Sequence, residues 1–208
     1  MKLKATNATL ILLALIPTCV SAQDFSADVV YNAAKPPVSA EKSSSPAQTS
    51  KLFVSKDKLR LETNGASATV LVVDNGESTS FALYPEHKMY QPLANAPAEY
   101  FRVTDAENAC SDWQKASTEK IVCEKVGHET IDGRDAVKYT NKTTLAEPAT
   151  TAVWIDSTLR FVIKWESVGS GAELHHIVEG PQASALFVVP SNYELLRPMK
   201  KTSKAPKK

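Results

Sequence analysis

The chain has 208 residues, of which 43% are hydrophobic, 24 are basic and 23 are acidic, and this length suits one well-buried domain. Two of the basic residues lie in the first 22 positions and six in the last twelve. Neither segment contains an acid, so residues 23–196 carry a net charge of −7. This acidic body argues against a nucleic-acid partner, because phosphate contacts need clustered lysines and arginines.

The N-terminus predicts a secretory leader. Two lysines precede an apolar run over residues 10–16 that is too short to span a bilayer, and small residues lead up to Ala22, where a signal peptidase would cleave. We therefore expect residues 1–22 to be a signal peptide, and the mature protein to be periplasmic or secreted. The alternative is a lipoprotein signal that ends at Cys19, although Thr18 stands where a smaller residue is usual.

Strands are predicted directly after the leader. Residues 24–31 alternate apolar and mostly polar side chains, which is the period of a half-buried strand. A connection rich in proline and serine follows over residues 33–50. Residues 50–54 and 58–62 then flank a hairpin turn at residues 55–57, so an antiparallel sheet is expected.

The next hairpin has the strongest turn signal. Asn75-Gly76 predicts a two-residue type I′ turn, because both central residues of that turn need a positive φ. This turn would place Val72 opposite Thr79 within residues 70–84, and a short strand around residues 89–90 follows. The more apolar face of the hairpin holds Val70, Val72, Phe81 and Leu83.

One helix is predicted between residues 104 and 117. Thr104 and Glu107 have the spacing of a capping box. Apolar side chains then recur at the spacing of one helical face: Ala106, Ala109, Cys110 and Trp113. We expect this face to cover the sheet, with a further helical turn over residues 96–103.

Hairpins return in the C-terminal part. Asp132-Gly133 joins two long strands through a second two-residue turn. With strict alternation Cys123 would face away from Tyr139. Either the helix docks on that side, or Gly127 marks a β-bulge that resets the alternation. Strands are then predicted over residues 151–156, 159–166 and 172–179, and residues 183–189 form either a strand or a helical turn.

Two cysteines, Cys110 and Cys123, remain after cleavage. In an oxidising compartment such a pair predicts one disulfide, and its spacing is too wide for a C-x-x-C redox motif. The histidines lack ligand-type spacing to other donors, so we predict no metal or other cofactor. Residues 197–208 are interpreted as a basic disordered tail, with contact to a membrane surface through anionic lipid headgroups as the alternative.

The order of these parts resembles a known group of proteins. The blocks that carry the resemblance are KLFVSKDKLRLE, VLVVDNGESTSFALYPEHKMYQPL, CEKVGHETIDGRDAVKYTNKT and AVWIDSTLRFVIKWES. They are similar to successive segments of the periplasmic lipoprotein-carrier (LolA/LolB-like) superfamily, most of all to its uncharacterised secreted members. The proline often found near Phe161 is absent.

The resemblance implies a mainly β (α+β) fold in a single domain over residues 23–196. The implied architecture is a strongly curved antiparallel sheet, or unclosed β-barrel, with one or two helices covering its concave face. It also implies a non-enzymatic protein that binds or carries an apolar ligand, such as a lipid or a lipoprotein acyl chain, between sheet and helix.

Six large apolar residues are candidate ligand-lining positions: Val70, Val72, Phe81, Leu83, Trp154 and Trp165. Such residues on strands are ordinarily packed core, so a second hypothesis is an envelope interaction or structural module with a filled core. A third is a lipid-ester hydrolase, for which the sequence has no nucleophile motif. We expect a monomer.

Overall fold

A single sheet of twelve strands forms the framework of the described part of the chain. The computed structural model describes residues 24–33, 49–64, 69–74, 76–77, 79–93, 101–117, 121–143 and 150–197. The predicted signal peptide, and the predicted tail beyond Arg197, lie outside these residues.

The strands are β1 (Phe25–Ala33), β2 (Thr49–Ser55), β3 (Lys58–Thr63), β4 (Val70–Asp74), β5 (Thr79–Tyr84), β6 (Met89–Pro92), β7 (Ile121–Ile131), β8 (Arg134–Thr143), β9 (Thr150–Asp156), β10 (Val162–Ser167), β11 (Ser170–Glu179) and β12 (Glu194–Leu195). Short 3₁₀ turns are η1 (Pro85–His87), η3 (Ala106–Asn108) and η4 (Ser184–Phe187), and the α-helix is α1 (Ala109–Ala116).

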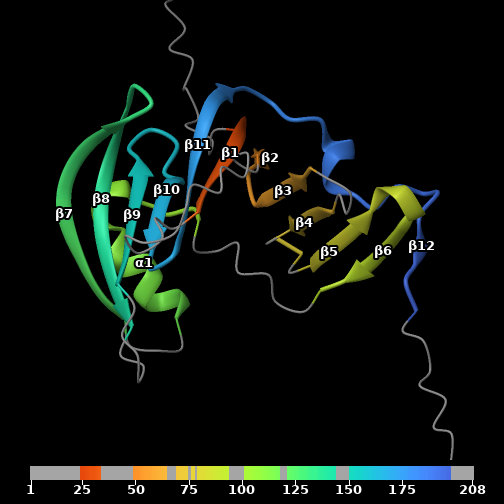
Figure 1. Ribbon diagram of the computed structural model, residues 1–208, viewed down its shortest axis with the longest axis horizontal. Coiled ribbons are helices and arrows are strands. Elements are labelled where there is room, and N and C mark those ends of the chain that lie inside the picture. The colour runs from red at the N-terminus through yellow and green to blue at the C-terminus, as the bar shows by residue number, and fades with distance from the viewer. Residues whose placement is uncertain are drawn as a thin grey trace, which may run out of the picture.

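The sheet is antiparallel except at one edge, and it is not closed. Its order is β12-β6-β5-β4-β3-β2-β1-β11-β10-β9-β8-β7, with β12 parallel to β6. The two edge strands lie at opposite sides of the molecule (Figure 1). Successive strands pair with one another from β1 to β6 and again from β7 to β11, and β1 joins the two series by pairing with β11. The predicted unclosed, mainly β fold is confirmed.

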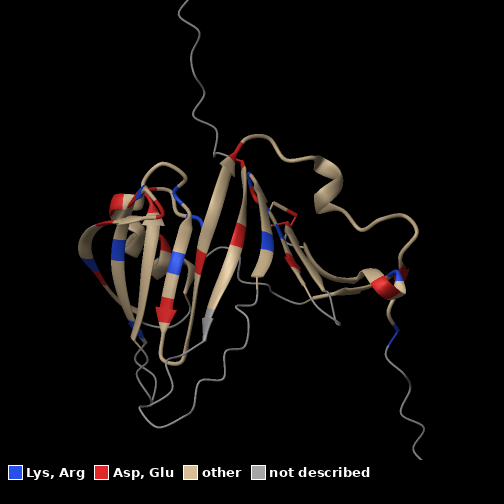
Figure 2. Ribbon diagram, turned by 45° about the horizontal axis from the view of Figure 1, so that its top comes forward, with Lys and Arg blue, Asp and Glu red and all other residues tan. Residues whose placement is uncertain are grey.

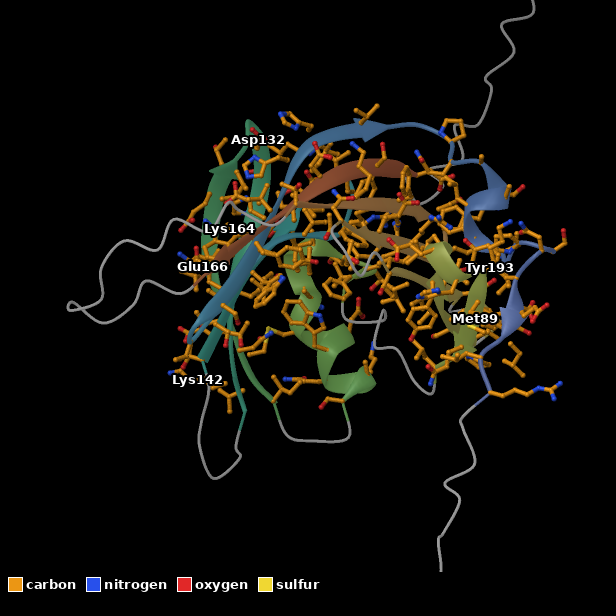
Figure 3. All side chains as sticks on the ribbon, turned by 45° about the vertical axis from the view of Figure 1, so that its right-hand side comes forward. Met89, Asp132, Lys142, Lys164, Glu166 and Tyr193 are labelled. Carbon is orange, nitrogen blue, oxygen red and sulfur yellow. A yellow bond between two sulfur atoms is a disulfide. The ribbon has the colours of Figure 1, made fainter. Side chains whose placement is uncertain are left out.

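The sheet curves over α1, which lies inside the bend formed by β7 to β10 (Figure 1; Figure 3). Ala109 and Trp113 of the helix are buried against Tyr139, Val153 and Ile155 of β8 and β9. The predicted apolar helical face is therefore the one that packs on the concave side of the sheet.

The helix begins differently from the prediction. The Asp105 carboxylate accepts a hydrogen bond from the Glu107 N–H at 2.9 Å, so the predicted capping box between Thr104 and Glu107 does not form. The Thr104 N–H and hydroxyl instead donate to Asp112 Oδ2, at 2.6 and 2.8 Å. The next residue in the chain competes for the cap because its carboxylate is a stronger acceptor than a threonine hydroxyl.

The register of β4 and β5 also differs from the prediction. Thr79 pairs with Asp74 rather than with Val72, so residues 75–78 form a four-residue connection instead of a two-residue turn. Asp74 Oδ1 accepts a hydrogen bond from the Glu77 N–H at 3.2 Å, which favours the wider turn. The register moves by two residues, so every side chain keeps its predicted face.

The hairpin of β7 and β8 resolves the alternative left open by the sequence. Asp132 and Gly133 have φ values of 46° and 77° and form the predicted two-residue turn. A register shift between Lys125 and Gly127 marks a β-bulge. The bulge brings Cys123 onto the same face as Tyr139, which is the face that α1 covers.

The C-terminal segment returns across the sheet. Residues 184–187 form the helical turn η4, one of the two alternatives, and Phe187 is buried there against Val72 and Leu83. The segment ends at β12 beside β6, where Tyr193 and Met89 lie at the same edge of the molecule (Figure 3).

Candidate ligand-binding site

A cavity of about 230 Å³ lies on the concave face of the sheet. Six strands, β1 to β4, β10 and β11, supply most of its wall, and Phe101 and Phe161 supply the rest. Its lining is Val29, Tyr31, Leu52, Leu59, Leu61, Leu71, Phe101, Phe161, Val162, Ile163, Trp165, Ala172 and Leu174. Apart from the Tyr31 hydroxyl and the Trp165 indole N–H, these side chains have no polar atom, so the cavity favours an apolar occupant.

A second cavity of about 200 Å³ adjoins the first beside α1. It is bordered by Trp113 of the helix and by β7 to β10. The two cavities share Phe101, Val162 and Trp165. The second one differs in having two polar residues in its wall, Asn141 and Thr151. Together the cavities form two compartments that meet at Trp165 and Phe101.

The aromatic boundary between the compartments is fixed by backbone pairing. The Val162 N–H donates to the Phe101 carbonyl at 2.8 Å, and the Val103 N–H donates to the Arg160 carbonyl at 2.9 Å. Residues 101–103 therefore lie antiparallel to residues 160–162, at the start of β10. The Phe101 ring stacks on Phe161 with centroids 6.1 Å apart.

The helix that borders the second cavity is anchored to the sheet at its N-terminal turn. The buried Tyr139 hydroxyl donates to the Ala106 carbonyl at 2.7 Å and accepts from the Ala109 N–H at 3.3 Å. Burial raises the pKa of Tyr139. Trp113 packs edge-on against Tyr139, with ring centroids 5.5 Å apart.

The predicted disulfide between Cys110 and Cys123 is confirmed, with the two Cα atoms 5.6 Å apart. It joins α1 to β7 and gives the helix a covalent attachment to the sheet. The bulge at Gly127 makes this bond possible, because without it Cys123 would face away from the helix.

Three buried side-chain atoms in the described part of the chain lack a hydrogen-bond partner: Arg102 Nη2, Asn141 Oδ1 and Ser50 Oγ. Asn141 borders the second cavity. Ser50 lies on the same face of β2 as Leu52, which lines the first. A buried polar atom without a partner costs about 1–3 kcal/mol, and such atoms in a folded protein call for an explanation such as an unseen ligand or water.

Trp165 is the one candidate lining residue that borders both of the cavities described here. The four candidates of the β4–β5 hairpin lie on the other face of the sheet. Val70, Val72 and Leu83 are buried beneath Phe187, and Phe81 packs edge-on against Tyr90 at 6.2 Å. A ligand-lining role for these four stays a prediction.

Trp154 has charged neighbours on the strand face opposite the helix. Its ring lies between the ammonium groups of Lys138 and Lys164, 4.7 and 4.8 Å from the ring centroid. Its indole N–H donates to Glu129 Oε2 at 2.7 Å. Lys164 in turn pairs with Glu166 at 3.1 Å (Figure 3). Trp154 is nevertheless buried and belongs to a hydrophobic core cluster. Acidic and basic residues intersperse over the strands around it (Figure 2).

Sequence reasoning missed Leu71 and Phe101, which line the larger cavity. Leu71 lies on the face of the hairpin that also carries serines, so that face was the less apolar of the two. The alternation of Leu59 and Leu61 in β3 was the signal that could have identified the cavity side.

Within the described ranges, no group of three or more His, Cys, Asp or Glu residues is placed to hold a metal ion. The helices in those ranges are all too short or too polar to cross a membrane.

No protein-family model and no curated protein sequence matches this chain. Solved structures share its fold. An uncharacterized conserved protein from Thermus thermophilus is 7% identical with a TM-score of 0.54, and the match covers 86% of this chain and 93% of that one. MucB in complex with MucA(peri) is 12% identical with a TM-score of 0.50. That match covers 86% of this chain but 58% of MucB, so the chain spans less than two thirds of MucB.

A LolA superfamily protein from Nitrosomonas europaea is also similar, at 12% identity and a TM-score of 0.37, over 80% of this chain and 90% of that one. The shared feature of the first two structures and this chain is the fold.

Proposed function

We propose that this protein binds an apolar ligand, the acyl chain of a lipid or lipoprotein, in the two adjoining cavities on the concave face of the sheet, the smaller of which is bordered by α1. The observation that carries the proposal is the apolar wall of the larger cavity, in which twelve of thirteen lining residues have no polar side-chain atom except an indole N–H. Each methylene group moved from water into such a wall contributes about 0.8 kcal/mol.

The size of the cavities supports binding over a filled core. Protein interiors are close-packed and contain few voids larger than a water molecule. An apolar cavity of roughly 150 Å³ in a protein core stays dry and binds small apolar molecules. Cavities of about 200 and 230 Å³ that share three residues exceed that size.

We propose further that the protein acts outside the cytoplasm and without catalysis. The basic and apolar leader and the disulfide both suit an oxidising compartment. The polar side chains that border the two cavities are Tyr31, Asn141 and Thr151, with the Trp113 and Trp165 indoles. This set supports binding, and an assay with lipid esters would contradict it if wild-type protein released fatty acid.

Filling the larger cavity tests the proposal. Ala172 is buried, lines the cavity and pairs with Trp165, so Ala172→Phe places a ring where the ligand would lie. We expect wild-type protein purified from the periplasm to carry lipid in native mass spectrometry. Ala172→Phe should carry less than a tenth of that load.

Two further variants distinguish a filled cavity from an unfolded protein. Overpacking costs about 1–3 kcal/mol, so Leu61→Trp repeats the filling from the opposite wall, on β3. Ala185→Phe adds the same ring at an exposed position of η4 and should keep the full lipid load. Wild-type protein that carries no lipid and binds no added fatty acid would end the proposal.

A protein-binding module is the second candidate. MucB, which shares the fold, has been solved in complex with MucA(peri). In the present chain β7 is an edge strand with exposed Val122 and Val126, and an edge strand can pair with an added peptide strand. Lipid-free protein that elutes in a larger complex, lost on Val122→Pro, would favour this function.

A further inference from the structure

Arg102 presents an unsatisfied cation beside the larger cavity. Its Nη2 atom is buried and has no hydrogen-bond partner in the described part of the chain. Its Nη1 atom donates to the Leu159 carbonyl at 3.5 Å, which is beyond the usual range for an N–H···O bond. The guanidinium therefore keeps donors available for another acceptor.

The position of Arg102 is fixed from two sides. Its backbone forms a bridge with Phe161, and its guanidinium carbon lies 5.7 Å from the centre of the Phe161 ring. Phe161 also lines the larger cavity. The Phe161 ring thus contacts the guanidinium of Arg102 and also borders the larger cavity.

A small polar recess is bordered by Arg102 and shares part of its wall with the larger cavity. It has a volume of about 30 Å³ and is bordered by Arg102, Lys56, Asp57 and Lys58 together with apolar residues. It shares Leu59 and Phe161 with the larger cavity. A molecule with a long apolar part in the cavity would therefore have its end at the recess.

The neighbouring acids leave the guanidinium donors free. Burial lowers the pKa of Arg102, and the nearby carboxylates of Asp24 and Asp57 oppose that effect. The Asp24 oxygens accept hydrogen bonds from the Ser55 hydroxyl and the Lys56 N–H, at 2.8 and 3.0 Å. Asp57 is exposed. Neither acid accepts a hydrogen bond from Arg102, and among the described residues an external oxyanion would compete only with the distant Leu159 carbonyl.

We propose that Arg102 binds the anionic headgroup, a carboxylate or phosphate, of an amphiphile whose acyl chain lies in the larger cavity. A guanidinium is suited to this role because its planar fork matches two oxygens of one oxyanion. A ligand without an acceptor oxygen at this end would leave Nη2 unsatisfied. This inference rests on the proposed function and adds the class of headgroup to it.

The test compares two ligands with the same chain. Binding of tetradecanoate and tetradecanol is measured at pH 7.5 by displacement of a fluorescent naphthylamine probe. A hydrogen-bonded charge pair should make wild type bind tetradecanoate at least about tenfold tighter than the alcohol. Arg102→Met keeps the apolar stem over Phe161 but removes the donors, so the two ligands should then bind equally.

Lys51→Met is the matched control. It also removes one positive charge, but Lys51 pairs with Asp28 at 2.7 Å on an exposed site, so the tenfold preference should persist. Because the readout is a ratio within each protein, a partly unfolded variant still gives an answer. A preference that survives in Arg102→Met overturns the inference.

The remaining outcomes separate this inference from the proposed function. Wild type that binds neither ligand ends the proposed function itself. Wild type that binds both equally keeps the function and overturns the headgroup site. Inorganic phosphate that displaces tetradecanoate at equal concentration would show an anion site independent of the cavity, which also overturns it.

Discussion

The carboxylate of Asp156 organises the turn between β9 and β10. The residue is 1% exposed. Its Oδ1 accepts hydrogen bonds from the N–H groups of Thr158 and Leu159, at 2.8 and 2.7 Å, and its Oδ2 accepts from Arg134. The Asp156 side chain therefore accepts from two N–H groups of the turn and from Arg134, and it positions the strand that carries Trp165.

Asp156→Ala should lower the free energy of unfolding by about 3 kcal/mol, because it leaves two N–H groups without their acceptor and removes one of the two carboxylates, Asp156 and Glu179, that pair with the partly buried Arg134. Asp156→Asn should lose less, since the amide oxygen still accepts from the turn. Urea unfolding measures both, with exposed Thr158→Ala as the control. A loss below 1 kcal/mol in Asp156→Ala would contradict this reading of the turn.

Glu129 makes the stability of the outer face depend on pH. Hydrogen bonds from Lys138 Nζ at 2.8 Å and from the Trp154 indole at 2.7 Å hold the pKa of Glu129 below its ordinary value of 4.5. A carboxyl with a lowered folded pKa stabilises the fold above its unfolded pKa. That stabilisation is lost as the pH falls through the folded value.

Wild type should therefore lose more thermal stability than Glu129→Gln between about pH 5 and pH 3. Melting curves at half-unit pH steps measure the difference. The Glu129 side chain is 44% exposed, so 0.5 M salt should shrink the gap. Parallel pH profiles for the two proteins at low salt would show that the pair contributes nothing.

At the scale of elements, α1 is held by more than packing. The disulfide to β7, the Tyr139 hydroxyl and the edge-on Trp113 ring all fix the same short helix. An isolated helix of eight residues is not stable in water, so these attachments account for its presence.

Replacing Cys110 and Cys123 together by alanine should lower the free energy of unfolding by about 3 kcal/mol, the chain-entropy value for a loop of this size. Reducing the wild type should produce the same loss, which controls for side-chain effects. Near-ultraviolet circular dichroism should remain, because Trp113 still packs on Tyr139. An unchanged urea midpoint after reduction would contradict the assignment.

Local patterns predicted most elements and failed where a side chain competed with the backbone signal. The Asp132-Gly133 turn and the buried face of α1 follow from short-range spacing. The Asn75-Gly76 turn was wrong because Asp74 accepts from Glu77 and widens the connection. The cap of the helix was wrong because Asp105 takes the place of Thr104.

At the scale of the whole molecule, the cavity depends on pairings between distant segments. β1 pairs with β11, and β12 pairs with β6; no local pattern encodes either contact. Sequence reasoning therefore chose the more apolar face of the β4–β5 hairpin as the ligand side. In the structure η4 covers that face of the hairpin, and Leu71, on the opposite face, lines the cavity.

Phe187→Ala tests this division of the two faces. Phe187 is buried against Val70, Val72 and Leu83, so its removal should cost about 3 kcal/mol, measured by urea unfolding. Lipid load should stay at the wild-type level, because the cavity lies on the opposite face. A reduced load at unchanged stability would instead favour the role first predicted for Val70, Val72 and Leu83.

The disulfide between α1 and β7 limits the size of any bound ligand. A helix that is covalently joined to the adjacent strand cannot move outward to enlarge the cavity that it borders. The disulfide therefore fixes the longest acyl chain that the protein can hold. Affinity for a homologous series of fatty acids should then rise with each added carbon up to one chain length and rise no further beyond it. In the reduced protein the rise in affinity should level off gradually over several chain lengths.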